Sequence, residues 1–132
     1  MSHRDETVLI KVSAGVIERE GAFLMTRRLP GTHLAGYWEF PGGKRHSGES
    51  VEDCLRRELR EELAVQVEVG TRIAVTRHAY PDRSVEITFL RCRLVGEPNP
   101  QLGQEMRWIP RPDLPAVRVP PADQQLVSIL MG

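Results

Sequence analysis

The sequence has few cysteines, few aromatic residues and no net charge. Its 132 residues include only two cysteines, Cys54 and Cys92, without the close spacing of metal ligands. We expect both to be buried free thiols, which suits a reducing compartment. Eighteen Lys and Arg balance eighteen Asp and Glu, so no overall positive charge is available to hold a nucleic-acid polymer. A small phosphorylated ligand needs only a few Arg side chains or a bound cation, and therefore stays open as a partner.

Long apolar runs are also missing. No stretch is long enough to span a bilayer. Residues 1–7 lack the apolar segment and the small-residue cleavage site of a signal peptide. We therefore expect a cytoplasmic protein without a membrane partner, folded as a single domain over residues 1–132. The sequence gives no sign of the oligomeric state.

Short strand-like segments make up most of the chain, together with two helix-like ones. Gly and Pro break up residues 27–45, which predicts loop, short strand and loop. Ser50 and Asp53 resemble a capping box, so a helix is expected from there through Leu63. A second helix is predicted at 121–131. The other segments, all predicted to be strands, are 8–17, 22–26, 65–78, 84–95 and 105–109.

The segment 84–95 carries apolar residues on both of its faces. Val85, Ile87 and Phe89 alternate on one face. Leu90, Cys92 and Leu94 fall on the other. A strand of this kind belongs to a sheet that is covered on both sides. We therefore predict an α/β fold in which a mixed sheet lies between two helical layers.

The first helix brings acidic side chains to the edge of its buried face. Glu58 and Glu62 bracket the apolar stripe, and Glu61 lies on the adjoining flank. Three neighbouring carboxylates repel one another unless a cation compensates them. With oxygen ligands only, a hard ion such as Mg²⁺ or Mn²⁺ fits best. The stripe itself consists of Val51, Leu55, Leu59 and Leu63.

A Glu-rich helix is more often an ordinary solvated face with ion pairs. The segment before this helix favours a metal site over an ordinary solvated face. Glu49 and the run Pro41-Gly42-Gly43 precede it, and a glycine loop ahead of a helix lets backbone groups approach a phosphate or a metal closely.

Residues 43–65, GKRHSGESVEDCLRRELREELAV, resemble the Nudix box, the signature of hydrolases that cleave nucleoside diphosphate linkages. The one departure is Ala64, where the family has glycine. Because alanine tolerates a left-handed conformation poorly, we expect this helix to end differently from the family pattern. The eight matching positions are Gly43, Glu49, Arg57, Glu58, Leu59, Glu61, Glu62 and Val65.

The resemblance implies a Nudix α/β/α sandwich and a site for Mg²⁺, with Mn²⁺ as the alternative ion. Its metal ligands would be Glu58, Glu61, Glu62 and the Gly42 carbonyl. Among the catalytic residues Glu58, Arg57 and Glu61, Glu58 is the first choice as the general base or the group that orients it. Arg57 would pair with a box carboxylate and fix its rotamer; the alternative is an ordinary surface ion pair.

Outside the box, the sequence resembles the MutT branch, the 8-oxo-dGTP diphosphatases that sanitise the nucleotide pool and so protect DNA. Segments that carry this likeness include 26–28, 39–44 and 81–83. It places Phe40 against the base, a contact that suits any base. The nucleotide-binding positions it implies are Arg28, His33, Glu39, Phe40, Pro41, Gly42, Arg83 and Asp123.

Two positions differ from that branch. Asp123 stands where the branch has an Asn that reads the base, and an ionised Asp offers acceptors only. Leu102 stands where the bacterial prototype has a loop glutamate that serves the metal. Glu105 is the candidate replacement, and a surface charge at the edge of a strand is the equally weighted alternative.

These observations predict an Mg²⁺-dependent nucleoside triphosphate diphosphatase. Its leading substrate is 8-oxo-dGTP, which it would convert to 8-oxo-dGMP and pyrophosphate. Within the enzyme class, CTP, other nucleoside triphosphates and ADP-ribose are the alternatives. In a different class stands a Nudix module that binds nucleotides without catalysis, which would have no need of the acid cluster.

Overall fold

Seven strands form one mixed sheet in a computed structural model that describes residues 8–132. Along its main path the strand order is β3-β2-β1-β6-β5, while β4 pairs with β1 and β7 with β2. The signal-peptide expectation for residues 1–7 lies outside the described residues. The elements are β1 (Leu9–Arg19), β2 (Ala22–Arg27), β3 (Trp38–Glu39), β4 (Gly42–Lys44), α1 (Val51–Leu63), β5 (Gln66–Tyr80), β6 (Arg83–Val95), β7 (Met106–Pro110), the 3₁₀ helix η1 (Arg111–Ala116) and α2 (Pro121–Met131).

The centre of the sheet is a parallel pair. β1 runs parallel to β6, with Ala14 opposite Phe89, although more than sixty residues separate the two strands in sequence. β6 is joined to β5 as an antiparallel hairpin, and β1 to β2 as another. The two hairpins were predictable from their turns, whereas the parallel pairing between them was not.

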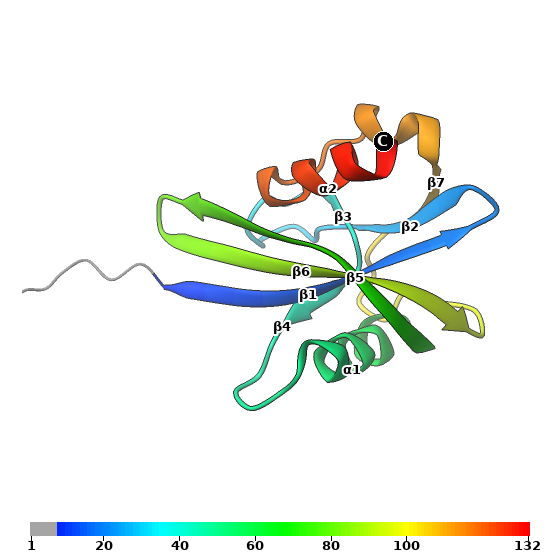
Figure 1. Cartoon of the computed structure of the whole chain (residues 1–132), viewed down its shortest axis with the longest axis horizontal. Helices are drawn as coiled ribbons and strands as arrows, with labels where there is room; N and C mark the ends of the chain where they lie inside the picture. The colour runs from blue at the N-terminus through cyan, green and yellow to red at the C-terminus, as the bar shows by residue number, and fades with distance from the viewer. Residues whose placement is uncertain (1–7) are drawn as a thin grey trace, which may run out of the picture.

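The two helices cover opposite faces of the sheet, so the predicted sandwich is confirmed (Figure 1). On the α2 face, Ile87 and Phe89 of β6 belong to one buried cluster. On the α1 face, Leu90, Cys92 and Leu94 belong to the other. Both cysteines are buried free thiols, as expected. Each fully buried large apolar side chain contributes about 1.5–3 kcal/mol, and these clusters provide the main stabilisation of both layers.

Helix α1 begins as predicted and ends differently from the expectation. The Asp53 N–H donates to the Ser50 hydroxyl over 3.0 Å, which caps the first turn. At the other end Ala64 adopts the left-handed conformation, with φ 51° and ψ 40°, and its N–H donates to Arg60 O. The family-like helix end therefore forms without glycine, and our expectation of a differently shaped end was wrong. A non-glycine residue in this conformation costs about 1–2 kcal/mol, which the packing of the remaining helix offsets.

Smaller differences concern the irregular segments. Residues 27–45 contain two short strands, β3 and β4, rather than one. β7 begins at Met106, one residue later than predicted, and the loop after it contains the unpredicted 3₁₀ helix η1. None of the helices within residues 8–132 has the length and apolar character needed to cross a membrane.

Candidate active site

A cavity of about 510 Å³ opens between the sheet, the amino end of α2 and the carboxyl half of α1. This volume suits a nucleotide-sized ligand. Apolar side chains of β1 and β6, among them Val12 and Ile87, line one wall. Glu58 and Glu62 line one end, and Phe40 and Asp123 line another part of the surface. The cavity therefore joins an acidic region to a largely apolar one.

Two carboxyl groups of the box meet at the acidic end. Glu58 and Glu62 hydrogen-bond to each other, and burial together with this acidic neighbour raises the pKa of Glu62. The close approach of Glu58 to β4 depends on Gly43. A Cβ atom at position 43 would lie 2.2 Å from Glu58 Oε1, so any side chain there would displace the carboxylate.

The Arg57 guanidinium hydrogen-bonds to several carboxyl groups at the acidic end and links them to one another. Its guanidinium donates to Glu49 Oε2 over 2.7 Å, to Glu58 Oε2 over 2.7 Å and to Glu61 Oε1 over 3.1 Å. It also donates to the Lys44 carbonyl over 2.9 Å. The hydrogen bond from Arg57 lowers the pKa of Glu49 to about 2, and the same pairing raises the pKa of Arg57. With its side chain only 15 % exposed, Arg57 forms a shielded network rather than an ordinary surface ion pair.

The donor set at this end fits a hard divalent cation. Glu58, Glu62 and Gly42 all line the cavity. Burial, followed by the neighbouring Glu58, raises the pKa of Glu62, and a cation beside these oxygens would favour the ionised carboxylate. Glu61 does not line the cavity; its side chain is 58 % exposed and bonded to Arg57. Within residues 8–132, no three His, Cys, Asp or Glu side chains form a ready-made metal cluster. The acids are therefore close together without being a closed ligand set.

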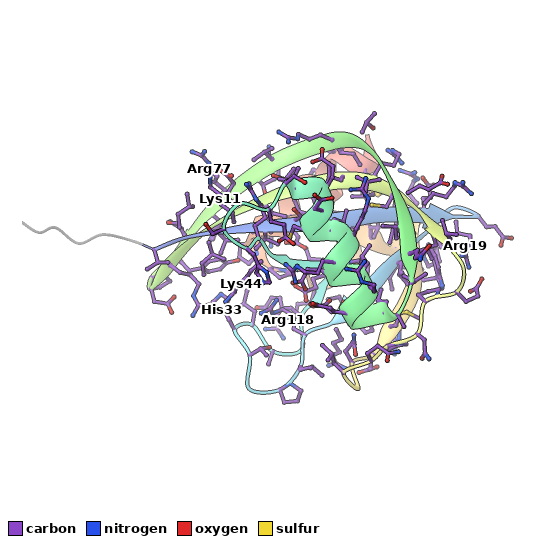
Figure 2. The ribbon with its side chains drawn as sticks, turned by 90° about the horizontal axis from the view of Figure 1, so that it is seen from below. Lys11, Arg19, His33, Lys44, Arg77 and Arg118 are labelled. Carbon is purple, nitrogen blue, oxygen red and sulfur yellow. The ribbon has the colours of Figure 1, made fainter. Side chains whose placement is uncertain are left out.

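Four predicted nucleotide contacts, Arg28, His33, Glu39 and Arg83, line the cavity where the loop 28–37 meets β5 and β6. Arg28 donates to Glu39 Oε1 over 2.7 Å, while burial raises the pKa of Glu39. His33 lies edge-on against Tyr80, with ring centroids 4.7 Å apart, and burial with the charges of Arg83 and Arg28 lowers its pKa. In Figure 2 His33 is labelled beside this loop, near Lys44 of β4, and both line the cavity.

Phe40 and Asp123 form the buried wall of the cavity. The Phe40 ring is edge-on to Phe89, with centroids 6.0 Å apart. Asp123 is 4 % exposed, and burial, followed by the nearby Glu39, raises its pKa to about 8. The Phe40 N–H donates a hydrogen bond to the Asp123 carboxyl group. This raised pKa favours the protonated carboxyl group, which can donate a hydrogen bond, whereas an ionised Asp offers acceptors only.

Besides Arg57 and Glu61, two predicted residues do not line the cavity. Glu105 accepts from Arg27 over 2.8 Å and is half exposed, because β7 pairs with β2 and directs it to the sheet edge. Its position agrees with the alternative stated above, in which Glu105 is a surface charge at the edge of a strand. The Pro41 carbonyl accepts from the Gly15 N–H over 2.7 Å, so Pro41 serves the sheet and does not line the cavity.

The residues that line the cavity and were missed by sequence reasoning include Tyr80, Lys44 and Gln104. Lys44 directly follows Gly43, the first residue of the box, and could have been found from that position. Tyr80 lies between the predicted strands 65–78 and 84–95, where no element was expected. Gln104 is buried and donates to the Glu62 carbonyl over 3.2 Å, a long-range contact that leaves no local signal.

The sequence matches the model of the NUDIX domain over residues 13–128. It is 36 % identical over 126 residues to the 8-oxo-dGTP diphosphatase of Haemophilus influenzae, covering 94 % of this chain and 93 % of that protein. A CTP pyrophosphohydrolase of Escherichia coli is 39 % identical over 79 residues, covering 60 % of this chain and 58 % of the relative. The solution structure of the E. coli ORF135 protein superposes with a TM-score of 0.83 at 31 % identity, covering 95 % of this chain and 90 % of that one.

The box network, the layered fold and these similarities agree with one another. The chain belongs to the Nudix family of hydrolases, which act on phosphoric anhydride bonds and require a divalent metal ion.

Proposed function

We propose that this protein, as a single Nudix domain, is a cytoplasmic, Mg²⁺-dependent nucleoside triphosphate diphosphatase that converts 8-oxo-dGTP to 8-oxo-dGMP and pyrophosphate. The observation that supports the substrate best is the cavity itself. It combines an acid cluster at one end with a buried, protonated Asp123 beside Phe40. A triphosphate with a base that needs both a donor and an acceptor fits this arrangement.

The residues that would hold Mg²⁺ are Glu58, Glu62 and the Gly42 carbonyl, joined by the exposed Glu61. When bound, the ion neutralises diphosphate oxygens and polarises the attacking water. Glu58 is placed to accept a proton from that water or to orient the group that does. Arg57 fixes the Glu58 rotamer through its 2.7 Å bond, because a guanidinium stays charged and cannot itself act as the base.

Asp123 distinguishes oxidised from ordinary guanine by matching donors with acceptors. Guanine presents two neighbouring acceptors, N7 and O6, on its major-groove edge. In 8-oxoguanine N7 carries a hydrogen, so this edge presents one donor and one acceptor. A protonated carboxyl group also offers one of each. It can pair with both atoms of the oxidised base, whereas with ordinary guanine one acceptor faces another.

CTP is the second candidate, and the same residue favours it. Cytosine presents an amine donor beside the ring acceptor N3, which a protonated carboxyl group also matches. The similarity to a CTP pyrophosphohydrolase points the same way. A module that binds nucleotides without catalysis explains neither the shielded Arg57 network nor the raised pKa of Glu62.

The test is pyrophosphate release with Mg²⁺ across 8-oxo-dGTP, dGTP, CTP, dCTP and ADP-ribose, compared as kcat/KM. We expect 8-oxo-dGTP to exceed dGTP by about tenfold or more, which is about 1.4 kcal/mol in the transition state. A profile led by CTP would transfer the assignment to the second candidate. Binding without pyrophosphate release from any of the five would contradict the enzyme itself. Repeating the best reaction with Mn²⁺ and Ca²⁺ identifies the preferred ion.

A further inference from the structure

The amino end of α2 is fastened to β5 by a buried threonine. Thr76 is 3 % exposed, and its hydroxyl donates to the Ala122 carbonyl over 2.8 Å. Ala122 is the residue immediately before Asp123, and both line the cavity. A buried hydroxyl bonded to a single carbonyl fixes the height of this helix end above the sheet.

A second hydroxyl of the same strand approaches the backbone of the same residue, Ala122. Tyr80 lies four residues after Thr76, so both side chains point to one face of β5. The Ala122 backbone hydrogen-bonds to the Tyr80 hydroxyl, while burial raises the pKa of that hydroxyl. The ring of Tyr80 is fixed in turn by edge-on contacts with His33 and His78, at 4.7 and 4.6 Å between centroids.

Helix α2 has little to fix its own first turn. It follows Pro120 and begins with Pro121, and no side chain caps its amino end. The Asp123 N–H closes the first turn on the Pro120 carbonyl over 2.9 Å, but its carboxyl group accepts from the Phe40 N–H and does not cap the helix. The position of the Asp123 carboxyl therefore depends on contacts from outside the helix, and the hydroxyls of β5 provide them.

We propose that Thr76 and Tyr80 are positioning residues for base discrimination, which act by holding the Ala122 backbone and thereby the Asp123 carboxyl group at hydrogen-bonding distance from the base. This proposal rests on the base-reading role given to Asp123 under the proposed function. Neither residue takes part in the chemistry at the acidic end, so their effect is confined to which nucleotide is selected.

The experiment compares Thr76→Val, Thr76→Ser and Tyr80→Phe with a matched control, Thr88→Val. Thr88 is a buried threonine of β6, adjacent in sequence to Ile87 and Phe89 of the α2-face cluster and therefore on the opposite, α1 face of the sheet. Both valine variants undergo the same chemical change. The ratio of kcat/KM for the preferred nucleotide to that for its least favoured competitor is measured, together with kcat, KM and the melting temperature.

We expect Thr76→Val to lower this ratio by about fivefold through KM, with kcat nearly unchanged. Thr76→Ser should keep the ratio because it keeps the hydroxyl, and Thr88→Val should keep it because it lies on the other face. Tyr80→Phe, which removes one hydroxyl oxygen, should also lower the ratio. It tests the positioning role if Thr76→Val does not fold.

Asp123→Leu, which removes both the donor and the acceptor, is measured beside these variants to separate the two hypotheses. If the wild type does not prefer 8-oxo-dGTP, the substrate proposal fails, and the positioning proposal is then tested on whichever preference the wild type shows. A preference that is lost in Asp123→Leu but stays unchanged in Thr76→Val and Tyr80→Phe would overturn the positioning role. A preference unchanged in Asp123→Leu as well would overturn it too, since there would be no base-reading carboxyl group to position.

Discussion

The two ends of the cavity are built in opposite ways. The acidic end comes mainly from one helix and the short strand before it, and charged groups in contact with one another hold it in place. The base end draws on β3, β5 and α2, and it holds a carboxyl group that burial keeps neutral. The chemistry of the first depends on charge and that of the second on the absence of charge, so substitutions at the two ends should separate turnover from selectivity.

The largest expected effect is at the acidic end. Glu62→Gln removes a charged ligand while keeping the shape of the side chain, and we expect kcat to fall by about 100-fold or more. Nucleotide affinity should be partly kept, because the base end is untouched. Isothermal titration calorimetry and pyrophosphate release measure the two quantities. Unchanged turnover would remove Glu62 from the metal site; Glu68→Gln, at an exposed position on β5, is the control.

A smaller effect is expected at the base end, where selectivity should depend on pH. Since Asp123 donates only while protonated, the preference of the wild type for 8-oxo-dGTP over dGTP should fall as the pH rises through about 8. Asp123→Asn carries a donor at every pH, so its preference should not change over the same range. Parallel profiles of kcat/KM between pH 6 and 9.5 test this, and a wild-type ratio that stays constant would show that Asp123 does not read the base as an acid.

The same carboxyl group should make the fold less stable as the pH rises. Its pKa is about 8 in the folded protein against 3.8 as the ordinary value, so between these values the folded state binds more protons than the unfolded state. Stability therefore declines with rising pH across that window. Asp123→Asn has no ionisable group at this position, so it escapes this pH-dependent loss and should be more stable than the wild type at pH 7 by about 1–3 kcal/mol. Urea unfolding at pH 7 and at pH 3.5 should show the advantage only at the higher pH.

The smallest expected effect is at the end of α1. Ala64→Gly relieves the strain of the left-handed conformation and should stabilise the protein by about 0.5–1 kcal/mol, after the entropy that glycine adds to the unfolded chain. Ala35→Gly is the control, because Ala35 has no positive φ and should lose stability slightly. Denaturant midpoints are sufficient to measure both. A destabilised Ala64→Gly variant would mean that the alanine side chain makes a contact worth more than the strain.

The acidic end could be predicted from sequence because its residues are close neighbours along the chain. Helical periodicity placed Glu58 and Glu62 beside the buried stripe, and the box identified Arg57. Local reasoning could not decide where pairing between distant strands sets the outcome. Glu105 was left open between a metal role and a surface charge at a strand edge, and the pairing of β7 with β2 directs it to Arg27.

The base end could be identified from sequence only by resemblance, and the sequence left the ionisation state of Asp123 open. An isolated Asp is ionised at neutral pH, and nothing beside Asp123 in the sequence suggests otherwise. The burial that raises its pKa comes from the packing of α2 against the sheet, and the bond from Thr76 to Ala122 spans 46 residues. Contacts of this kind leave no periodic or local pattern in a single sequence.

The sequence by itself determined the hairpins, both helices, the double-sided sheet and the acidic helix, because turn chemistry and side-chain periodicity act over a few residues. Only the tertiary structure decided the parallel pairing of β1 with β6, the position of Glu105 outside the cavity and the burial that raises the pKa of Asp123. Each of these depends on which distant segments meet and exclude water, since the ionisation of a buried group is set by its surroundings rather than by its residue type.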